Sequence, residues 1–339
     1  MNYILKNENA IFYECGYSCD NAIFLKLGSE SFFITDSRYT IEASLGVQNA
    51  EVIIDKDLIT KANELIEKSK IKVLNFDPKE WSLFHFEKLK RSLEVHFSQK
   101  IDFSFSKRAI KTPHEISLLG KACQLGSDAF DRLARDFSLN GIDLSEKELN
   151  FRAKSILSSM GEYDLSFEPI VAINENSAKP HALPTSKRVQ KSDLILVDAG
   201  LKYKRYCSDR TRCIEMQDNF HFNIEEKFSS SKIQKIYDSV RKAHDEAISK
   251  ARVGMKAKEI DKIARDVITN DGFGELFIHS TGHGVGLDIH EFPFISQTSE
   301  MIIEEGMVFT IEPGIYIENE FGIRIEDCVV MENARARIL

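Results

Sequence analysis

The chain has 339 residues, of which 42% are hydrophobic, and it carries a formal net charge of −8 at pH 7. This length exceeds what one ordinary hydrophobic core needs, so we expect a globular protein with two domains. The acidic balance argues against a nucleic-acid partner, because such a partner would require a basic face. A membrane partner is not expected either, since the chain lacks a run of roughly 18 apolar residues.

The start of the chain and its cysteines indicate a reducing compartment. Residues 1–8 lack a basic region followed by an apolar stretch, so no signal peptide is predicted and a cytoplasmic location is expected. The six cysteines form no CxxC pair, and we expect them to be reduced and buried.

Residues 1–106 alternate short apolar runs with helical stretches, which predicts a small α/β domain. Its strands are expected at residues 22–27, 31–35, 52–54 and 73–76, and its helices near residues 58–68 and 80–92. The polar segment 104–108 is expected to be a link. The second domain is therefore predicted to comprise residues 107–339.

Helix-start signals open this second domain. Thr112 is expected to be an N-cap, with Pro113 at the first helical position and Glu115 completing a capping box, for a helix that runs to about residue 137. Ser145 and Glu148 repeat the signature for a helix to about residue 160. A strand is expected after these helices at 168–173, and two further helices are expected at 233–251 and 257–269. The chain thus has two sets of helices, each followed by strands, which indicates an internal duplication.

Two aspartates lie in neighbouring extended runs. Asp198 ends the apolar run 194–197, and Asp209 lies in a second run, 206–214. A hairpin that turns at Tyr203 and Lys204 would place Asp198 directly opposite Asp209, with both side chains on one face.

Two glutamates repeat the arrangement near the end of the chain. Glu312 lies near the start of the run 311–317, and Glu326 lies near the end of the run 323–327. A turn centred on Asn319 would make them neighbours across the hairpin. Like charges placed directly opposite each other repel, so two such pairs are expected where cations lie between them.

Six segments together resemble one known family. They are residues 176–182, 198–200, 208–212, 279–291, 311–316 and 324–327. In this order they are similar to the motifs of the aminopeptidase P/prolidase metallopeptidases. The resemblance covers residues 107–339 strongly and implies a catalytic domain with the "pita-bread" fold, built from two pseudo-twofold related halves. Residues 36–40 carry a weaker resemblance to the N-terminal creatinase/prolidase-like domain of that family.

The resemblance also implies a metal centre. Two divalent ions would be held by Asp198, Asp209, His283, Glu312 and Glu326. Four carboxylates and one imidazole favour manganese, with cobalt, zinc or iron as alternatives. The presence of all five argues against a creatinase-like, metal-free enzyme. Cys207, next to this set, is a remote candidate for a soft ligand.

Further roles follow from the same resemblance. His290 and His181 would hydrogen-bond the substrate carbonyl and the tetrahedral intermediate. His279 would line the pocket for proline. Arg324 lies two residues before Glu326 on the same strand face, which favours an ion pair beside the metal ligands and a contact with the substrate carboxylate.

The predicted reaction is hydrolysis of the peptide bond before proline, by either an Xaa-Pro aminopeptidase or an Xaa-Pro dipeptidase. A metal-bridging hydroxide would attack the carbonyl, and Glu312 would carry the proton to the leaving nitrogen. Two alternatives stay open: a methionine aminopeptidase-like exopeptidase, and a catalytically silent peptide-binding module on the same fold. The expected partners are proline-containing peptides and a second copy of the chain in a homodimer. The family often has glycine where this chain has Arg205.

Overall fold

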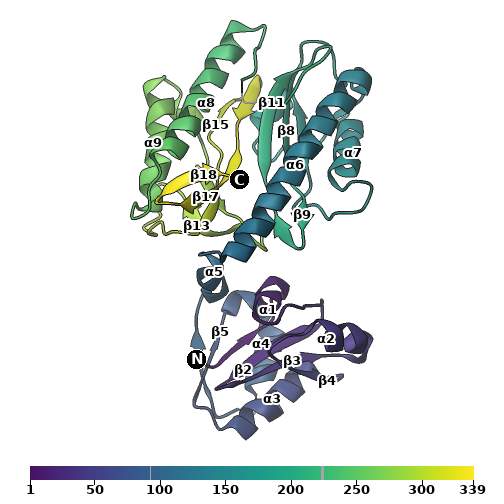
Figure 1. The fold of residues 1–339 in the computed structure, drawn as a ribbon, viewed down its shortest axis with the longest axis vertical. Coiled ribbons are helices and arrows are strands. Elements are labelled where there is room, and N and C mark those ends of the chain that lie inside the picture. The colour runs from purple at the N-terminus through teal and green to yellow at the C-terminus, as the bar shows by residue number, and fades with distance from the viewer. Residues whose placement is uncertain (92, 223–224) are drawn as a thin grey trace. The chain divides into compact units, whose positions relative to one another are not determined.

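The computed structural model describes residues 1–91, 93–222 and 225–339. The chain divides into two compact units, Met1–Arg108 and Ala109–Leu339. Figure 1 shows the elements of each unit. None of the described helices combines the length and the apolar character that crossing a bilayer would require.

The first unit is one mixed sheet with helices on its faces. The strand order is β4-β3-β2-β1-β5-β6. Successive side chains of a strand point to opposite faces of the sheet. In β2, Ile23 and Leu25 accordingly belong to the hydrophobic cluster on one face and Phe24 to the cluster on the other. The strands are β1 (Tyr3–Leu5), β2 (Ala22–Leu27), β3 (Glu30–Thr35), β4 (Glu51–Ile54), β5 (Val73–Phe76) and β6 (His96–Gln99), and the helices are α1 (Glu8–Cys15), α2 (Thr40–Gly46), α3 (Leu58–Ser69), α4 (Leu83–Lys90) and α5 (Phe103–Arg108).

The predicted strands and helices of this unit match the observed β2 to β5, α3 and α4, although the predicted end of α4 at Ser92 lies outside the described residues. The prediction of a polar link at 104–108 is wrong, because these residues belong to α5. Packing explains the helix: the ring of Phe103 lies 5.5 Å from that of Tyr3 in β1, and Lys107 forms an ion pair with Glu14 of α1. Such contacts override weak local propensity.

The second unit begins with two capped helices and a small sheet. Both predicted capping boxes are confirmed, at Thr112 with Glu115 and at Ser145 with Glu148. The sheet has the order β11-β8-β7, and its apolar face packs on the helices in one cluster. The elements are α6 (Pro113–Asn140), α7 (Glu146–Leu157), β7 (Ile170–Ile173), β8 (Leu194–Ala199), the short β9 (Lys202–Tyr203) and β10 (Tyr206–Cys207), and β11 (Arg210–Glu215).

The second half repeats the order of two helices followed by strands. Its main sheet has the order β13-β12-β14-β17-β18, beside the hairpin β15-β16. The elements are α8 (Ser231–Lys250), α9 (Ala257–Asn270), β12 (Gly282–Gly284), β13 (Glu291–Ile295), β14 (Val308–Ile311), β15 (Gly314–Ile317), β16 (Phe321–Arg324), β17 (Asp327–Glu332) and β18 (Arg335–Ile338). Single 3₁₀ turns lie at Ser37–Tyr39, Pro78–Glu80, Asn174–Ala178 and Gly274–Leu276.

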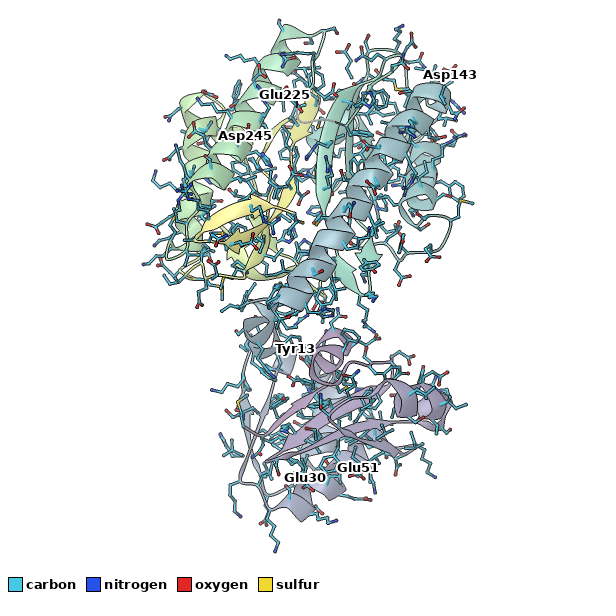
Figure 2. All side chains as sticks on the ribbon, in the orientation of Figure 1. Tyr13, Glu30, Glu51, Asp143, Glu225 and Asp245 are labelled. Carbon is cyan, nitrogen blue, oxygen red and sulfur yellow. The ribbon has the colours of Figure 1, made fainter. Side chains whose placement is uncertain are left out.

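The two halves of this unit meet along their strands. Helices α6 and α7 lie on one side of the strands and α8 and α9 on the other (Figure 1). Asp143, which follows α6, and Asp245, on α8, mark these opposite sides in Figure 2. At the junction, the Glu326 N–H donates to the Thr211 carbonyl oxygen at 3.2 Å. The two strand systems therefore join where two of the candidate ligand segments lie.

Candidate metal centre and substrate pocket

A cavity of about 590 Å³ lies in the second unit. It brings together every site residue that the sequence predicts, although these residues are scattered over more than a third of the chain. They are His181, Asp198, Asp209, His279, His283, His290, Glu312, Arg324 and Glu326.

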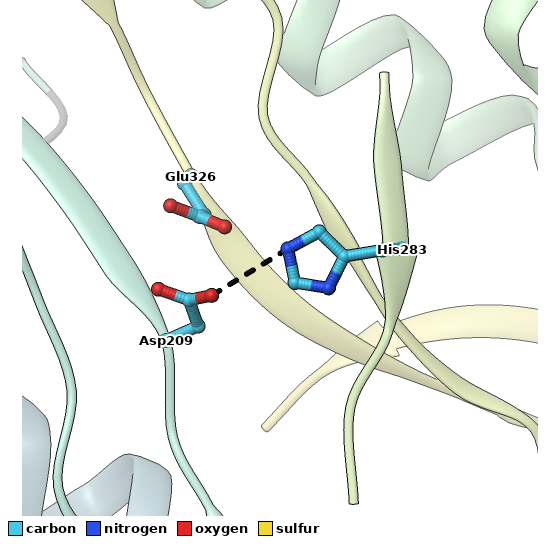
Figure 3. Close-up of side chains that lie close together, drawn as sticks. All are labelled: Asp209, His283 and Glu326. Carbon is cyan, nitrogen blue, oxygen red and sulfur yellow. Dashed lines mark ion pairs between the residues drawn. The ribbon is translucent and has the colours of Figure 1, made fainter. Parts of the chain in front are cut away.

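Three of the predicted ligands form a tight group. One ligand atom each from Asp209, His283 and Glu326 lies within 4.8 Å of the others, and all three residues are buried. Figure 3 shows the two carboxylates turned toward the imidazole from separate segments, which lie directly before β11 and β17. His283 Nε2 lies 3.7 Å from an Asp209 carboxylate oxygen and 3.5 Å from a Glu312 carboxylate oxygen. These separations leave room for a cation between the groups.

The imidazole of His283 is oriented to bind a metal ion through Nε2. Its Nδ1 lies 3.2 Å from the Gly284 carbonyl oxygen, which assigns the proton to Nδ1 because a carbonyl can only accept. Burial, helped by His290, lowers the pKa of His283 to about 3. The ring is therefore neutral, and the lone pair of Nε2 faces the carboxylates.

The four carboxylates form a buried cluster that contains fewer positively charged side chains than negative ones. Burial, followed by repulsion from the neighbouring carboxylates, raises the pKa of Asp209 and of Glu326 well above their usual range. Burial likewise raises the pKa of Glu312 to about 7. Among the described residues, one carboxylate oxygen of Asp198 and one of Asp209 have no hydrogen-bond partner. Hard divalent ions fit this set of donors, because they would neutralise the charge and satisfy the bare oxygens.

The first hairpin differs from the prediction. Asp198 pairs with Thr211, so the prediction that Asp198 lies directly opposite Asp209 is wrong. The turn lies one residue later than expected, at Lys204 and Arg205, which have φ values of 48° and 74°. Neither is a glycine or asparagine, so the sequence did not mark this left-handed two-residue turn. The resulting shift of two residues keeps both aspartates on one face.

The second hairpin has the predicted register. Asn319 has a φ of 61°, and Gly314 pairs with Arg324 around it. The same register continues in the main sheet, where Ile311 pairs with Asp327. Glu312 and Glu326 lie opposite each other between these two ladders.

Thr211 is a site residue that the sequence reasoning missed. Its hydroxyl donates to a Glu326 carboxylate oxygen at 2.6 Å and accepts from Arg324 Nε at 3.1 Å. The side chain is fully buried. Its position two residues after Asp209 in an extended segment, which directs it to the same face, was the available signal.

Arg324 is held by a network rather than lying free in the pocket. It forms an ion pair with Asp198 at 2.6 Å and donates to the Tyr316 hydroxyl at 2.8 Å. That hydroxyl lies 2.8 Å from His279 Nε2, and His279 Nδ1 lies 2.7 Å from the Ser280 carbonyl oxygen. The carbonyl assigns the proton to Nδ1, so Nε2 accepts from Tyr316. Burial, reinforced by Arg324, lowers the pKa of His279 to about 4, and the ring is neutral.

The two remaining histidines, His181 and His290, line the cavity and are exposed to solvent. The ring of His290 lies 4.2 Å from that of His283, and His181 lines the same cavity. Burial and the proximity of His181 lower the pKa of His290. Cys207, in contrast, is buried outside the ligand group, with its thiol directed to the Leu287 carbonyl oxygen at 3.7 Å and its pKa raised by burial to about 12. The structure therefore gives no support to Cys207 as a soft ligand.

A two-half α/β fold with a buried carboxylate and histidine centre under a cavity defines the class of metal-dependent hydrolases with the pita-bread fold. Residues 117–333 match the model of metallopeptidase family M24, and the chain belongs to this family.

Relatives and solved structures support the assignment. The chain is 38% identical to the Xaa-Pro dipeptidase of Pyrococcus furiosus over 254 residues, which are 74% of this chain and 69% of that protein. It is similar to the structure of the Xaa-Pro dipeptidase from Bacillus anthracis, with a TM-score of 0.91, 30% identity, and coverage of 99% of this chain and 92% of the other. The X-Pro aminopeptidase from Thermotoga maritima gives a TM-score of 0.88 at 30% identity, with coverage of 99% and 94%.

Proposed function

We propose that this protein is a metal-dependent exopeptidase that hydrolyses the peptide bond preceding proline. The observation that carries the proposal is the buried group of Asp209, His283 and Glu326 at the base of a cavity that also holds three further histidines and an arginine. The names of the similar proteins, Xaa-Pro dipeptidase and X-Pro aminopeptidase, support the same substrate class. They include both kinds of exopeptidase, so the proposal covers both.

The proposed cofactors are two divalent ions, with manganese favoured by the mostly oxygen donor set. Asp198, Asp209, His283, Glu312 and Glu326 would hold them. When bound, such ions supply a water of lowered pKa as nucleophile and polarise the scissile carbonyl.

The protein side chains would manage the protons and the developing charge. Glu312 lines the cavity beside His283, and its carboxylate is the proposed carrier of the proton to the leaving proline nitrogen. The lowered pKa of His290 keeps its imidazole neutral, so an N–H of the ring is available to the carbonyl oxygen as negative charge develops there. His181, on the same side of the cavity, is the second proposed donor.

The remaining cavity wall would recognise proline. The bond before proline has no N–H, so recognition must come from the ring and from the groups on either side. Ile289 and Phe294 provide apolar surface in the cavity. Because Arg324 is already paired with Asp198, its proposed contact with a substrate carboxylate uses a guanidinium whose orientation is fixed by Tyr316 and Thr211.

We further propose that residues 1–106 form the family's N-terminal domain and residues 107–339 its catalytic domain, and that the chain works as a cytoplasmic homodimer. The similar structures extend over 99% of this chain, which supports the domain assignment. The six free cysteines fit a reducing compartment. Light scattering on the purified protein tests the dimer.

The experiment compares metal-free and manganese-loaded protein on Ala-Pro, Ala-Pro-Ala and Ala-Ala-Ala, with products read by mass spectrometry. Metal-dependent cleavage of only the proline peptides is expected, and Asp209→Ala should abolish it. Cleavage of Ala-Pro alone would assign a dipeptidase. Release of methionine from Met-Ala-Ser with no attack on proline peptides would favour a methionine aminopeptidase. Metal-loaded protein that binds these peptides intact would be a silent binding module.

A further inference from the structure

One face of α6 lies against the segment that carries Asp209, a candidate metal ligand. A Cβ added at Gly126 would lie 3.0 Å from the Ser208 hydroxyl, next to Asp209. A Cβ added at Gly120 would lie 3.9 Å from the side chain of Leu339. Cys123 is three residues from each glycine and therefore lies between them on the same face of the helix.

Cys328 faces α6 from β17. Its backbone carbonyl accepts from the Leu339 N–H at 3.0 Å, which places it beside the residue that Gly120 contacts. Its thiol lies 3.5 Å from the carbonyl oxygen of Asp209, the residue that follows Ser208. The side chain of Cys123, together with burial, raises the pKa of Cys328 well above its usual range. Cys123 and Cys328 are therefore neighbours, beside the backbone of one candidate metal ligand, Asp209, and two residues after another, Glu326.

The two thiols differ in their access to solvent. Cys123 is partly exposed, whereas the other five cysteines, Cys328 among them, are buried. A small oxidant in solution therefore meets Cys123 first, and the thiol that can trap the oxidised form is on a neighbouring residue.

We propose that Cys123 and Cys328 are a redox modification site that closes to a disulfide on exposure to peroxide. Hydrogen peroxide transfers one oxygen to the Cys123 thiol, which becomes a sulfenic acid, and one water is released. The Cys328 sulfur then attacks the Cys123 sulfur: the S–S bond forms, the S–O bond breaks, and the hydroxide leaves with the Cys328 proton as a second water. A thiol reductant reverses the change.

The disulfide changes the metal centre through the backbone. The Cys328 thiol proton that faces the Asp209 carbonyl is lost, and β17 becomes tied to α6 directly after Glu326. Bond formation requires the sulfur atoms to approach to about 2 Å, which moves one or both elements. We expect metal retention and activity to fall by roughly tenfold, the size of effect seen when groups behind metal ligands are disturbed.

The test uses full-length protein treated with hydrogen peroxide. Mass spectrometry without reductant should show the loss of two hydrogen atoms and a proteolytic peptide pair that joins Cys123 to Cys328. Metal content and peptidase activity should fall together and return with dithiothreitol. Cys123→Ala should keep metal and activity through the same treatment, and Cys207→Ala, which removes a buried thiol of the same unit, should respond like the unaltered protein.

The inference is overturned if peroxide leaves the two cysteines unlinked, or if the linked protein keeps its metal and its activity. Only the activity part rests on the proposed function. A reduced protein that cleaves no proline peptide would refute that function, while the peptide pair and the metal content would still decide the inference. Cys328→Ser provides a second variant that cannot form the link.

Discussion

The two halves of the second unit carry their acidic residues on hairpins that differ in register. In the first half, Asp198 pairs with Thr211, and Asp209 lies two residues before that position. In the second half, one register runs through both ladders and places Glu312 opposite Glu326. The comparison teaches that the centre does not depend on equivalent pairing in the two halves. It depends on where the halves join.

The junction supplies what each half lacks. The first half contributes Asp209, while the second contributes His283 and Glu326, so the tight ligand group exists only when both are in place. Thr211 connects them, because it belongs to β11 and its hydroxyl contacts Glu326. Beside it, Arg212 forms a buried ion pair with Asp327 at 2.8 Å and donates to the Glu326 carbonyl oxygen at 2.7 Å.

Removing one carboxylate from either half should produce the largest effect. We expect Asp209→Asn and Glu326→Gln each to lower metal affinity and kcat/KM by more than about 100-fold, beyond the losses that follow changes behind the ligands. Metal analysis and peptide hydrolysis measure both quantities. Asp218→Asn, which alters an exposed carboxylate, is the control. If either Asp209→Asn or Glu326→Gln retained its metal while the other lost it, the two halves would not share one metal centre.

A change at the junction should have the next largest effect. Thr211→Val keeps the shape of the side chain but removes the hydroxyl that contacts Glu326 and Arg324. We expect metal affinity or kcat/KM to fall about 10- to 100-fold. Thr211→Ser keeps the hydroxyl and should recover most of the loss. Equal defects in the two variants would show that the methyl group, and thus packing, matters instead.

A change of pH should alter metal affinity less than the substitutions above. Without metal, Glu312 has a pKa raised by burial to about 7, so it holds a proton below that pH which a metal ion must displace. His283, with a pKa lowered to about 3, is neutral across the same range and offers no competing proton. Asp209 and Glu326, whose pKa values are also raised, hold further protons that the metal ion must displace. Metal affinity should therefore rise as pH increases across neutrality, with release of protons. Calorimetric titration in two buffers measures both, and an affinity that stays constant between about pH 5.5 and about pH 8 would contradict the assignment.

A substitution in the turn of the first hairpin should have the smallest effect, and the effect is on stability. Arg205 adopts a φ of 74°, which costs free energy for any residue with a Cβ. Arg205→Gly should raise the free energy of unfolding by about 0.5 kcal/mol, after allowance for the greater freedom of glycine in the unfolded chain. Denaturant titration measures the change.

Lys202→Gly, in β9 where φ is not positive, is the matched control and should lower the free energy of unfolding by roughly 0.5–1 kcal/mol. A loss of stability in Arg205→Gly would mean that contacts of the arginine side chain outweigh the strain of its backbone.

Much of this molecule was predictable where the signal is local. The capping boxes at Thr112 and Ser145 and the turn at Asn319 depend on a few neighbouring residues. The candidate site residues came from motifs, and the structure places all of them around one cavity. The register of the first hairpin was not predictable, because Lys204 and Arg205 are not residues that favour a left-handed turn.

The amino-acid sequence by itself determined the ends of the helices, the alternating apolar strands and the types of donor atom, since these follow from hydrogen bonding and side-chain chemistry within short segments. Tertiary structure alone decided that residues 103–108 form a helix, that Thr211 bridges the two halves, and that Cys123 and Cys328 are neighbours. These features arise from contacts between segments far apart in the chain. Local propensity carries no information about which distant side chain will complete a buried hydrogen bond.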